Sequence, residues 1–248
     1  RGDVFQIVLS RRFSQKFSGD EFCVYRQLRS INPSPYLFYF DYGSFKIFGS
    51  SPEAQLVIKD KIAEIHPIAG TFKRSGDDAV DKEKAIKLFE DDKENSEHMM
   101  LVDLARNDLS RSCSNVKVEK DREIQFYSHV IHLVSKVTGE LKSSSNDIIG
   151  NTFPAGTLTG APKHMAMKLI EKYEQHNRSF YGGAIGFIDF ENNFNHAILI
   201  RSFLSKNQNL FFQAGAGIVS KSNPDDELNE VYNKVGALLK ALEKAEEI

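Results

Sequence analysis

The stretch Gln213-Ala214-Gly215-Ala216-Gly217-Ile218-Val219 places two glycines among small residues near the end of the chain. It follows an apolar run, residues 209–212, and precedes a helical pattern that opens at Pro224. With so little side-chain bulk, backbone N–H groups can approach a ligand closely, and an anion such as a carboxylate suits such a place. Strand glycines also mark bulges and tight packing, so the stretch alone leaves an anion site and a packing role open.

The hydrophobic pattern around this stretch alternates between strands and helices. Many strands with hairpin-length turns, and helices in separate blocks, predict an α+β fold with mostly antiparallel sheets. No strand runs into a helix through a GxGxxG turn, which argues against a doubly wound nucleotide-binding fold. The predicted strands cover residues 4–9, 36–42, 45–48, 55–58, 61–66, 130–137, 182–190, 197–204 and 210–219; the predicted helices cover 21–31, 94–109, 163–173 and 227–246, with a loop over 153–162.

The composition is that of an ordinary globular protein, with 41% hydrophobic and 27% charged residues in a chain of 248. A net charge of -2 argues against nucleic-acid or membrane-surface binding, both of which usually show a basic patch. No apolar run approaches the roughly 20 residues needed to span a bilayer. Cys23 and Cys113 are typical of reduced thiols, and the chain is expected to be cytoplasmic, with no signal peptide at its start.

Two pairs of glutamates have helical spacing. Glu94 and Glu97 share one face of a predicted helix, and Glu227 and Glu230 repeat the spacing on the last helix. If the pairs face one another, they form an oxygen-rich, negative site of the kind that Mg²⁺ prefers. The alternative is solvated helix surface, in which Glu230 simply pairs with Lys234 one turn later.

Arg201 and His132 each allow two interpretations. Arg201 lies inside the apolar run 198–203, so it either needs a buried anionic partner or turns to solvent by strand alternation. His132 stands at the start of an apolar strand, as either a hydrogen-bonded structural histidine or a general base. The residues alone leave both questions open.

Seven blocks of sequence, in order and nearly end to end, resemble the chorismate-utilising enzymes. Within that family, the pattern is most similar to the large subunit (component I) of anthranilate synthases. Besides residues 213–219, the blocks are FQIVLS (5–10), GSSPE (49–53), PIAGT (67–71), EHMMLVDLARND (97–108), GTLTGAPK (156–163) and YGGA (181–184).

The resemblance implies a fold with two large antiparallel sheets, packed together and flanked by helices, and one chorismate-binding catalytic domain over residues 1–248. It implies Mg²⁺ as the cofactor, with Glu97 and Glu230 as ligands and Glu94 and Glu227 beside them. The metal would bind the ring carboxylate of chorismate.

The same resemblance assigns roles around the substrate. Glu53 is the acid that protonates the departing C4 hydroxyl, and His132 takes part in the elimination of pyruvate. The remaining positions bind the substrate: Gly70 and Thr71 at the ring carboxylate, Tyr181, Arg201, Gly215 and Gly217 at the enolpyruvyl carboxylate, and Gln6, Thr157 and Lys234 elsewhere on the substrate side.

Two positions favour attack by ammonia. Members of the family that add water carry a lysine base where this chain has Gln6, and glutamine takes up no proton. Many aminodeoxychorismate synthases carry a lysine nucleophile where this chain has Ala69. The expected reaction is amination at C2 and loss of pyruvate, giving anthranilate for tryptophan biosynthesis.

The ammonia would come from a glutamine amidotransferase subunit, because Cys23 and Cys113 lie in predicted helical contexts without a glycine-rich nucleophile turn. Two alternatives stay open: an aminodeoxychorismate synthase component I of the folate pathway, and a chorismate-binding module that is inactive without the family's N-terminal region. That region has no counterpart here, which suggests a piece of a longer chain. The run Asn32, Pro33, Ser34 and Tyr36 resembles half of a tryptophan pocket, and the oligomeric state is left open.

Overall fold

The structure is a computed structural model that describes residues 2–126 and 130–246, apart from the side chains of Thr71 and Lys93. Its contacts divide the chain into two compact units. The first unit comprises Arg1–Glu53, Thr157–Ile185 and Ala197–Ile248, and the second comprises Ala54–Gly156 and Gly186–His196.

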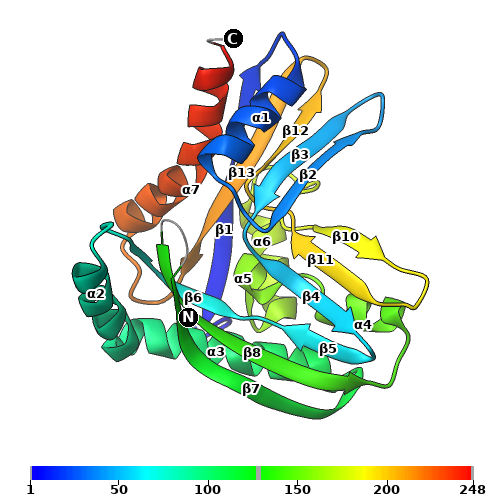
Figure 1. The fold of residues 1–248 in the computed structure, drawn as a ribbon, viewed down its shortest axis with the longest axis vertical. Coiled ribbons are helices and arrows are strands. Elements are labelled where there is room, and N and C mark those ends of the chain that lie inside the picture. The colour runs from blue at the N-terminus through cyan, green and yellow to red at the C-terminus, as the bar shows by residue number, and fades with distance from the viewer. Residues whose placement is uncertain (1, 127–129, 247–248) are drawn as a thin grey trace. The chain divides into compact units, whose positions relative to one another are not determined.

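The first unit is built on a six-stranded sheet in the order β2-β3-β12-β13-β1-β9 (Figure 1). Its longest pairing is antiparallel and runs from Ile7 opposite Ile218 to Lys16 opposite Asn209. The glycine-rich stretch therefore lies in a central strand. The strands are β1 (Gln6–Lys16), β2 (Tyr36–Asp41), β3 (Lys46–Ser51), β9 (Gly160–Ala161), β12 (Ser202–Lys206) and β13 (Asn209–Ile218).

Helices α1 (Glu21–Ile31) and α7 (Pro224–Ala245) lie side by side on this sheet (Figure 1). The side chain of Asn223 caps α7 by accepting hydrogen bonds from the next turn, and Pro224 supplies a fixed φ at the first helical position. Leu28 of α1 and Val235 of α7 are buried together with Phe48 and Phe203 of the sheet in the main apolar core of this unit. Burial of that face, rather than helix propensity, holds the two helices in place.

The second sheet has seven strands in the order β10-β11-β4-β5-β8-β6, and β7 pairs with β8 outside that path. Helix α3 (Asp92–Ser110) packs against β7 and β8, and it also contacts α4 (Ser145–Thr152) and α2 (Asp78–Glu90). The strands are β4 (Ala54–Lys59), β5 (Ile62–Ile65), β6 (Ile68–Lys73), β7 (Cys113–Phe126), β8 (Val130–Leu141), β10 (Ala184–Ile188) and β11 (Phe194–Ile198).

The predicted α+β class with antiparallel sheets flanked by helices is confirmed. The helices over 21–31 and 163–173 are confirmed residue for residue, the latter as α6 (Lys163–Tyr173). The helical context predicted for Cys113 is wrong, because this residue begins β7. The centre of this strand is a charged, exposed run, residues 117–121, and the strand pairs with β8 only. Both features weaken the hydrophobic alternation that predicts a strand.

The single strand predicted over 197–204 is also wrong. β11 ends at Ile198 and β12 begins at Ser202, and between them Arg201 adopts a left-handed φ of +50°. The Arg201 carbonyl accepts a hydrogen bond of 3.1 Å from Ser50 N–H, which connects the segment between β11 and β12 to β3. The predicted loop 153–162 contains a short helix, α5 (Gly156–Thr159), and the strand β9.

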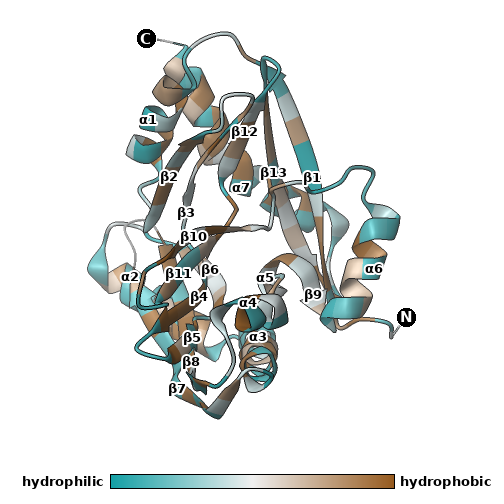
Figure 2. Cartoon of the chain, turned by 90° about the vertical axis from the view of Figure 1, so that its right-hand side faces the viewer, coloured by the Kyte–Doolittle hydropathy of each residue, from teal (hydrophilic) through white to brown (hydrophobic). Residues whose placement is uncertain are grey.

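Hydrophilic and hydrophobic residues alternate along the helices of both units (Figure 2). Within the described residues, every helix is too short or too polar to cross a bilayer.

Candidate active site

Glu53 is hydrogen-bonded to Thr157 in the first unit. Thr157 Oγ1 donates to Glu53 Oε1 at 2.9 Å across 104 residues of sequence, and the Glu53 carbonyl accepts from Ile198 N–H at 3.0 Å. The residue is half-buried overall, but its carboxyl group is enclosed. Burial raises the pKa of Glu53 to about 7, against the hydrogen bond from Thr157 and the charge of Lys234, which both lower it. Glu53 is therefore a carboxyl group that holds a proton near neutral pH.

Lys234 and Tyr181 both meet the glycine-rich strand at Gly215. Lys234 Nζ donates to the Gly215 carbonyl at 2.9 Å and pairs with Glu230 at 2.6 Å. Burial raises the pKa of Tyr181, while the charge of Arg178 and a hydrogen bond with the Gly215 backbone lower it. The structure thus brings together three of the predicted substrate-binding residues.

Close packing explains why glycine occupies positions 215 and 217. A Cβ at Gly215 would lie 2.7 Å from the Leu9 carbonyl oxygen, so this position admits no side chain beside β1. A Cβ at Gly217 would lie 2.5 Å from Nε2 of Gln6, so the missing side chain makes room for that amide. The packing interpretation of the stretch is confirmed, and Gln6 and Gly217 are neighbours.

Arg201 lies between β11 and β12, so strand alternation does not decide whether it turns to solvent. Within the described residues its guanidinium has no hydrogen-bond or ion-pair partner, and burial lowers its pKa. A partly desolvated cation without a counter-charge is favourable only where an anion can approach it.

The second unit holds a separate group around a bulge between β6 and β8. Gly70 is the residue at the register shift, and its φ of +66° is in the left-handed region. His132 Nδ1 lies 2.8 Å from the Gly70 carbonyl, which only accepts, so this nitrogen carries the proton. A Cβ at Gly70 would lie 3.2 Å from Glu94 Oε2. Gly70, His132 and Glu94 are therefore neighbours, and Thr71 pairs with His132 through the backbone, its side chain lying outside the described set.

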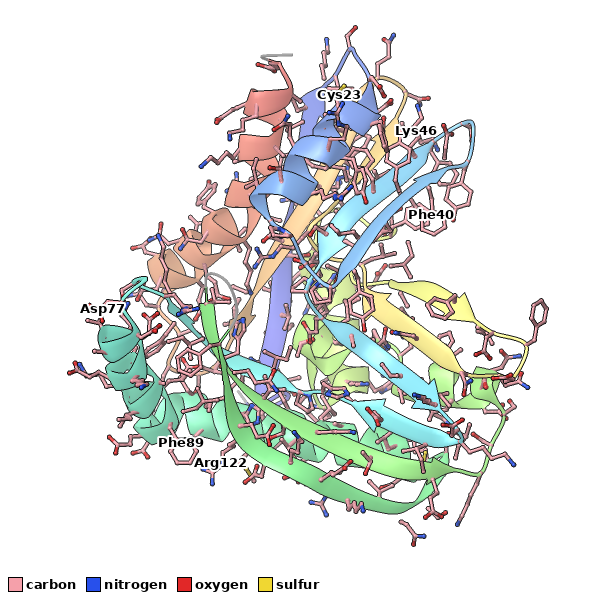
Figure 3. The ribbon with its side chains drawn as sticks, in the orientation of Figure 1. Cys23, Phe40, Lys46, Asp77, Phe89 and Arg122 are labelled. Carbon is pink, nitrogen blue, oxygen red and sulfur yellow. The ribbon has the colours of Figure 1, made fainter. Side chains whose placement is uncertain are left out.

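The beginning of α3 is anchored by His98, the residue after Glu97. His98 Nε2 lies 2.7 Å from Ser135 Oγ, which also accepts from Arg122 N–H at 2.9 Å. The Arg122 guanidinium lies 5.3 Å from the centroid of Phe89 at the end of α2, and the two side chains lie close together in Figure 3. These contacts fix the helical turn that carries Glu94 and Glu97.

The two glutamate pairs lie in different units. Glu94 and Glu97 are half-buried in the first turns of α3, and Glu227 and Glu230 lie at the start of α7. The predicted ion pair between Glu230 and Lys234 is confirmed. Across the described residues, no three His, Cys, Asp or Glu side chains lie close enough to hold a metal ion.

The run that resembles half of a tryptophan pocket connects α1 to β2. Asn32 caps the end of α1, its carbonyl accepts from Ser50 Oγ, and its side-chain amide lies 3.4 Å from Ser34 Oγ. Pro33 follows directly, and Tyr36 begins β2 opposite Ser51. This geometry explains where α1 ends.

Arg178 and Glu174 were not singled out from the sequence, although they contact the segments that carry Thr157 and Tyr181. Arg178 Nη1 donates to the Leu158 carbonyl at 2.6 Å, and its guanidinium lies 5.7 Å from the Tyr181 ring centroid. The sequence signal for this ion pair is the spacing of four residues between Glu174 and Arg178. Because α6 ends at Tyr173, the two residues lie outside the helix, and helical spacing does not predict their contact.

Comparisons with known proteins agree on one family. A family model described as chorismate binding enzyme matches residues 1–240. Anthranilate synthase component 1 of Aquifex aeolicus (strain VF5) is 47% identical over 251 residues, covering 100% of this chain and 51% of that protein. A crystal structure of anthranilate synthase component I from Streptococcus pneumoniae TIGR4 is 42% identical with a TM-score of 0.88, covering 96% of this chain and 53% of that chain.

A more distant solved structure has the same fold. The menaquinone-specific isochorismate synthase of Escherichia coli is 26% identical with a TM-score of 0.89, covering 97% of this chain and 57% of that chain. The chain therefore spans about half the length of the curated relatives it matches.

Proposed function

This chain belongs to the family of chorismate binding enzymes, and we propose that the protein makes anthranilate. The reaction consumes chorismate and ammonia and releases pyruvate and water. Relatives at 45 to 47% identity named anthranilate synthase component 1 support this choice over other members of the family. Gln6 and Ala69 support it as well, because neither side chain supplies the amine that water activation or a covalent adduct requires.

The observation that carries the proposal is the Glu53–Thr157 pair. Loss of the C4 hydroxyl as water needs a proton donor, and a general acid works best when its pKa lies near the working pH. With a pKa raised to about 7, Glu53 is partly protonated at neutral pH, and Thr157 fixes the position of its carboxyl group. Glu53 would donate its proton to the leaving oxygen as ammonia adds at C2.

Arg201 would bind the enolpyruvyl carboxylate. Its guanidinium lacks a partner among the described residues, and a carboxylate matches its planar donor fork. Tyr181 and the backbone at Gly215 and Gly217 would complete this end, since backbone N–H groups stabilise an anion without reorganising. Lys234, which is held at the Gly215 carbonyl, would add a positive charge nearby.

His132 would act in the second half of the reaction. With Nδ1 donating to the Gly70 carbonyl, His132 would use Nε2 to take up the C2 proton as pyruvate leaves. Gly70 and Thr71 would line the ring carboxylate, and Gln6 and Thr157 would face the substrate.

Carboxylate oxygens are the ligands that Mg²⁺ accepts, so the donor chemistry of Glu94, Glu97, Glu227 and Glu230 fits this metal. Bound Mg²⁺ would neutralise charge on a substrate carboxylate. Glu97→Gln and Glu230→Gln should each abolish turnover and keep the fold. If Glu230→Gln kept a normal Mg²⁺ dependence, this glutamate would not be a ligand.

A glutamine amidotransferase subunit would supply the ammonia, and anthranilate would serve tryptophan biosynthesis. Both cysteines are free thiols, which supports a cytoplasmic location. Cys23 lies on α1 and Cys113 begins β7, and neither stands in a glycine-rich nucleophile turn.

The test is to incubate the intact protein with chorismate, Mg²⁺ and ammonium and to follow anthranilate fluorescence. Formation of anthranilate together with equimolar pyruvate supports the proposal. Accumulation of 4-amino-4-deoxychorismate would assign the protein to p-aminobenzoate formation. Chorismate binding without turnover, seen by calorimetry, would identify a binding module.

A further inference from the structure

Arg178 forms a dense set of contacts in the first unit. Its Nε and Nη2 donate to the two carboxylate oxygens of Glu174 at 2.9 and 2.6 Å. Nη2 also donates to the Val8 carbonyl at 2.7 Å, and Nη1 donates to the Leu158 carbonyl at 2.6 Å. The side chains of Arg178 and Glu174 are 18% and 8% exposed, so both charges are largely withdrawn from water. A planar guanidinium can satisfy a carboxylate and two carbonyls at once, which an ammonium does not match.

Glu174 extends this set of contacts to the central strands. Ser10 donates to Glu174 Oε1 through its backbone N–H at 2.9 Å and through its hydroxyl at 2.6 Å. Gln213 Nε2 in turn donates to Ser10 Oγ at 2.7 Å. The Arg178–Glu174 pair therefore joins β1 and α5 to the segment after α6, and reaches β13 through Ser10. Helix α6 itself lies beside β1 and β9 (Figure 2).

Each segment that the pair contacts also carries a residue of the candidate site. Leu158 directly follows Thr157, the donor to Glu53. Tyr181 lies under the guanidinium at 5.7 Å. Ser10 stands opposite Gly215 in the pairing of β1 with β13. A shift of the guanidinium would move all of these groups together.

We propose that Arg178, paired with Glu174, is a positioning residue that sets the place of Thr157, Tyr181 and Gly215 relative to one another for chorismate turnover. This inference rests on the proposed function. All three nitrogens of the guanidinium donate to Glu174 or to the Val8 and Leu158 carbonyls, so Arg178 acts through these neighbours.

The test compares two arginine-to-lysine variants of the intact protein. Arg178→Lys keeps the charge but loses the planar fork. Arg74→Lys is the matched control, because Arg74 also pairs with an almost fully buried carboxylate, Asp81, at 2.8 Å in the second unit. Both variants should lower the melting temperature. Arg178→Lys alone should lower kcat/KM, by about 100-fold, since a misplacement of about 1 Å in an active site has that effect.

Two further readouts separate positioning from mere folding. KM for chorismate should rise in Arg178→Lys, because Tyr181 and Gly215 are displaced. The fall of kcat/KM with rising pH, which reports Glu53, should move to higher pH, because Thr157 lowers the pKa of Glu53 through its hydrogen bond. Lys234, whose charge also lowers that pKa, is unchanged in both variants. If both variants lose stability and neither changes KM or the pH profile, Arg178 is structural only.

Ser10→Ala covers the case in which Arg178→Lys fails to fold. It removes the hydroxyl that donates to Glu174 and accepts from Gln213, while the backbone N–H bond to Glu174 remains. The expected changes in KM and in the pH profile have the same sign and are smaller. An unchanged profile in a folded Ser10→Ala enzyme overturns the proposal. Wild-type enzyme that makes no anthranilate would instead reject the proposed function, independently of either variant.

Discussion

The two units hold their candidate residues by different means. In the first unit, side chains from distant parts of the sequence bond to one another, as Thr157 does to Glu53 and Lys234 does to Gly215. In the second unit, the backbone sets the geometry: a bulge at Gly70 turns a carbonyl towards His132 and leaves space beside Glu94. A side-chain network is sensitive to the loss of a single donor, whereas a backbone bulge is sensitive to an added atom.

The largest effect is expected when Glu53 loses its proton. Glu53→Gln should lower kcat by a factor on the order of 10² to 10⁴, the usual contribution of a general acid. KM should hardly change, because the amide oxygen still accepts from Thr157. The measurement is steady-state anthranilate formation at pH 7.

The control for this variant is its stability as a function of pH. A carboxyl group whose pKa is raised from 4.5 to about 7 binds its proton more tightly in the folded state. Its contribution to stability is therefore present below pH 4.5 and lost as the pH rises to about 7. Glu53→Gln should lack that loss in urea titrations. A variant that keeps more than about a tenth of the wild-type kcat would contradict the assignment of Glu53 as the acid.

Gly70→Ala tests the backbone geometry of the second unit. A left-handed φ costs an L-residue about 1 to 2 kcal/mol, and the new Cβ would lie 2.6 Å from Leu88 Cδ1, adding overpacking of about 1 to 3 kcal/mol. The matched control is Gly76→Ala, whose φ of +88° carries the backbone cost with no atom within 4 Å. Urea unfolding should show the larger loss of stability for Gly70→Ala. Equal losses would mean that Leu88 moves aside freely.

Short-range signals in the sequence predicted the parts of the fold that depend on neighbouring residues. Helical spacing over residues 21–31 and the breaker run at Asn32-Pro33 predict α1, and four-residue spacing predicts the Glu230–Lys234 pair. Sequence spacing does not reveal the partners of Arg178, because Val8, one of them, lies 170 residues away. It also does not reveal the left-handed φ of Arg201, which separates β11 from β12 within one apolar run. The metal site of four glutamates rests on helical spacing and on the family resemblance, and it stays a prediction.

Thr157→Val tests the side-chain network by removing one donor at constant shape. The hydrogen bond from Thr157 is the larger of the two influences that lower the pKa of Glu53, so its loss should raise that pKa above about 7. The protonated acid then persists to higher pH, and the fall of kcat/KM with rising pH should move in the same direction. The pH profile of kcat/KM from pH 5.5 to 9 measures the shift. A shift to lower pH would mean that Thr157 stabilises the neutral acid.

The smallest effect is expected for Lys234→Met, which keeps most of the aliphatic length and removes the ammonium. Lys234 lowers the pKa of Glu53 through its charge alone, and its effect is smaller than that of the hydrogen bond from Thr157. The fall of kcat/KM with rising pH should therefore move to higher pH by less than in Thr157→Val. Loss of the hydrogen bond to the Gly215 carbonyl should cost about 1 kcal/mol of unfolding free energy. The exposed pair with Glu230 should add little to that cost, because both side chains are more than 40% exposed. A pH shift larger than that of Thr157→Val would show that charge, and not the hydrogen bond, controls the proton on Glu53.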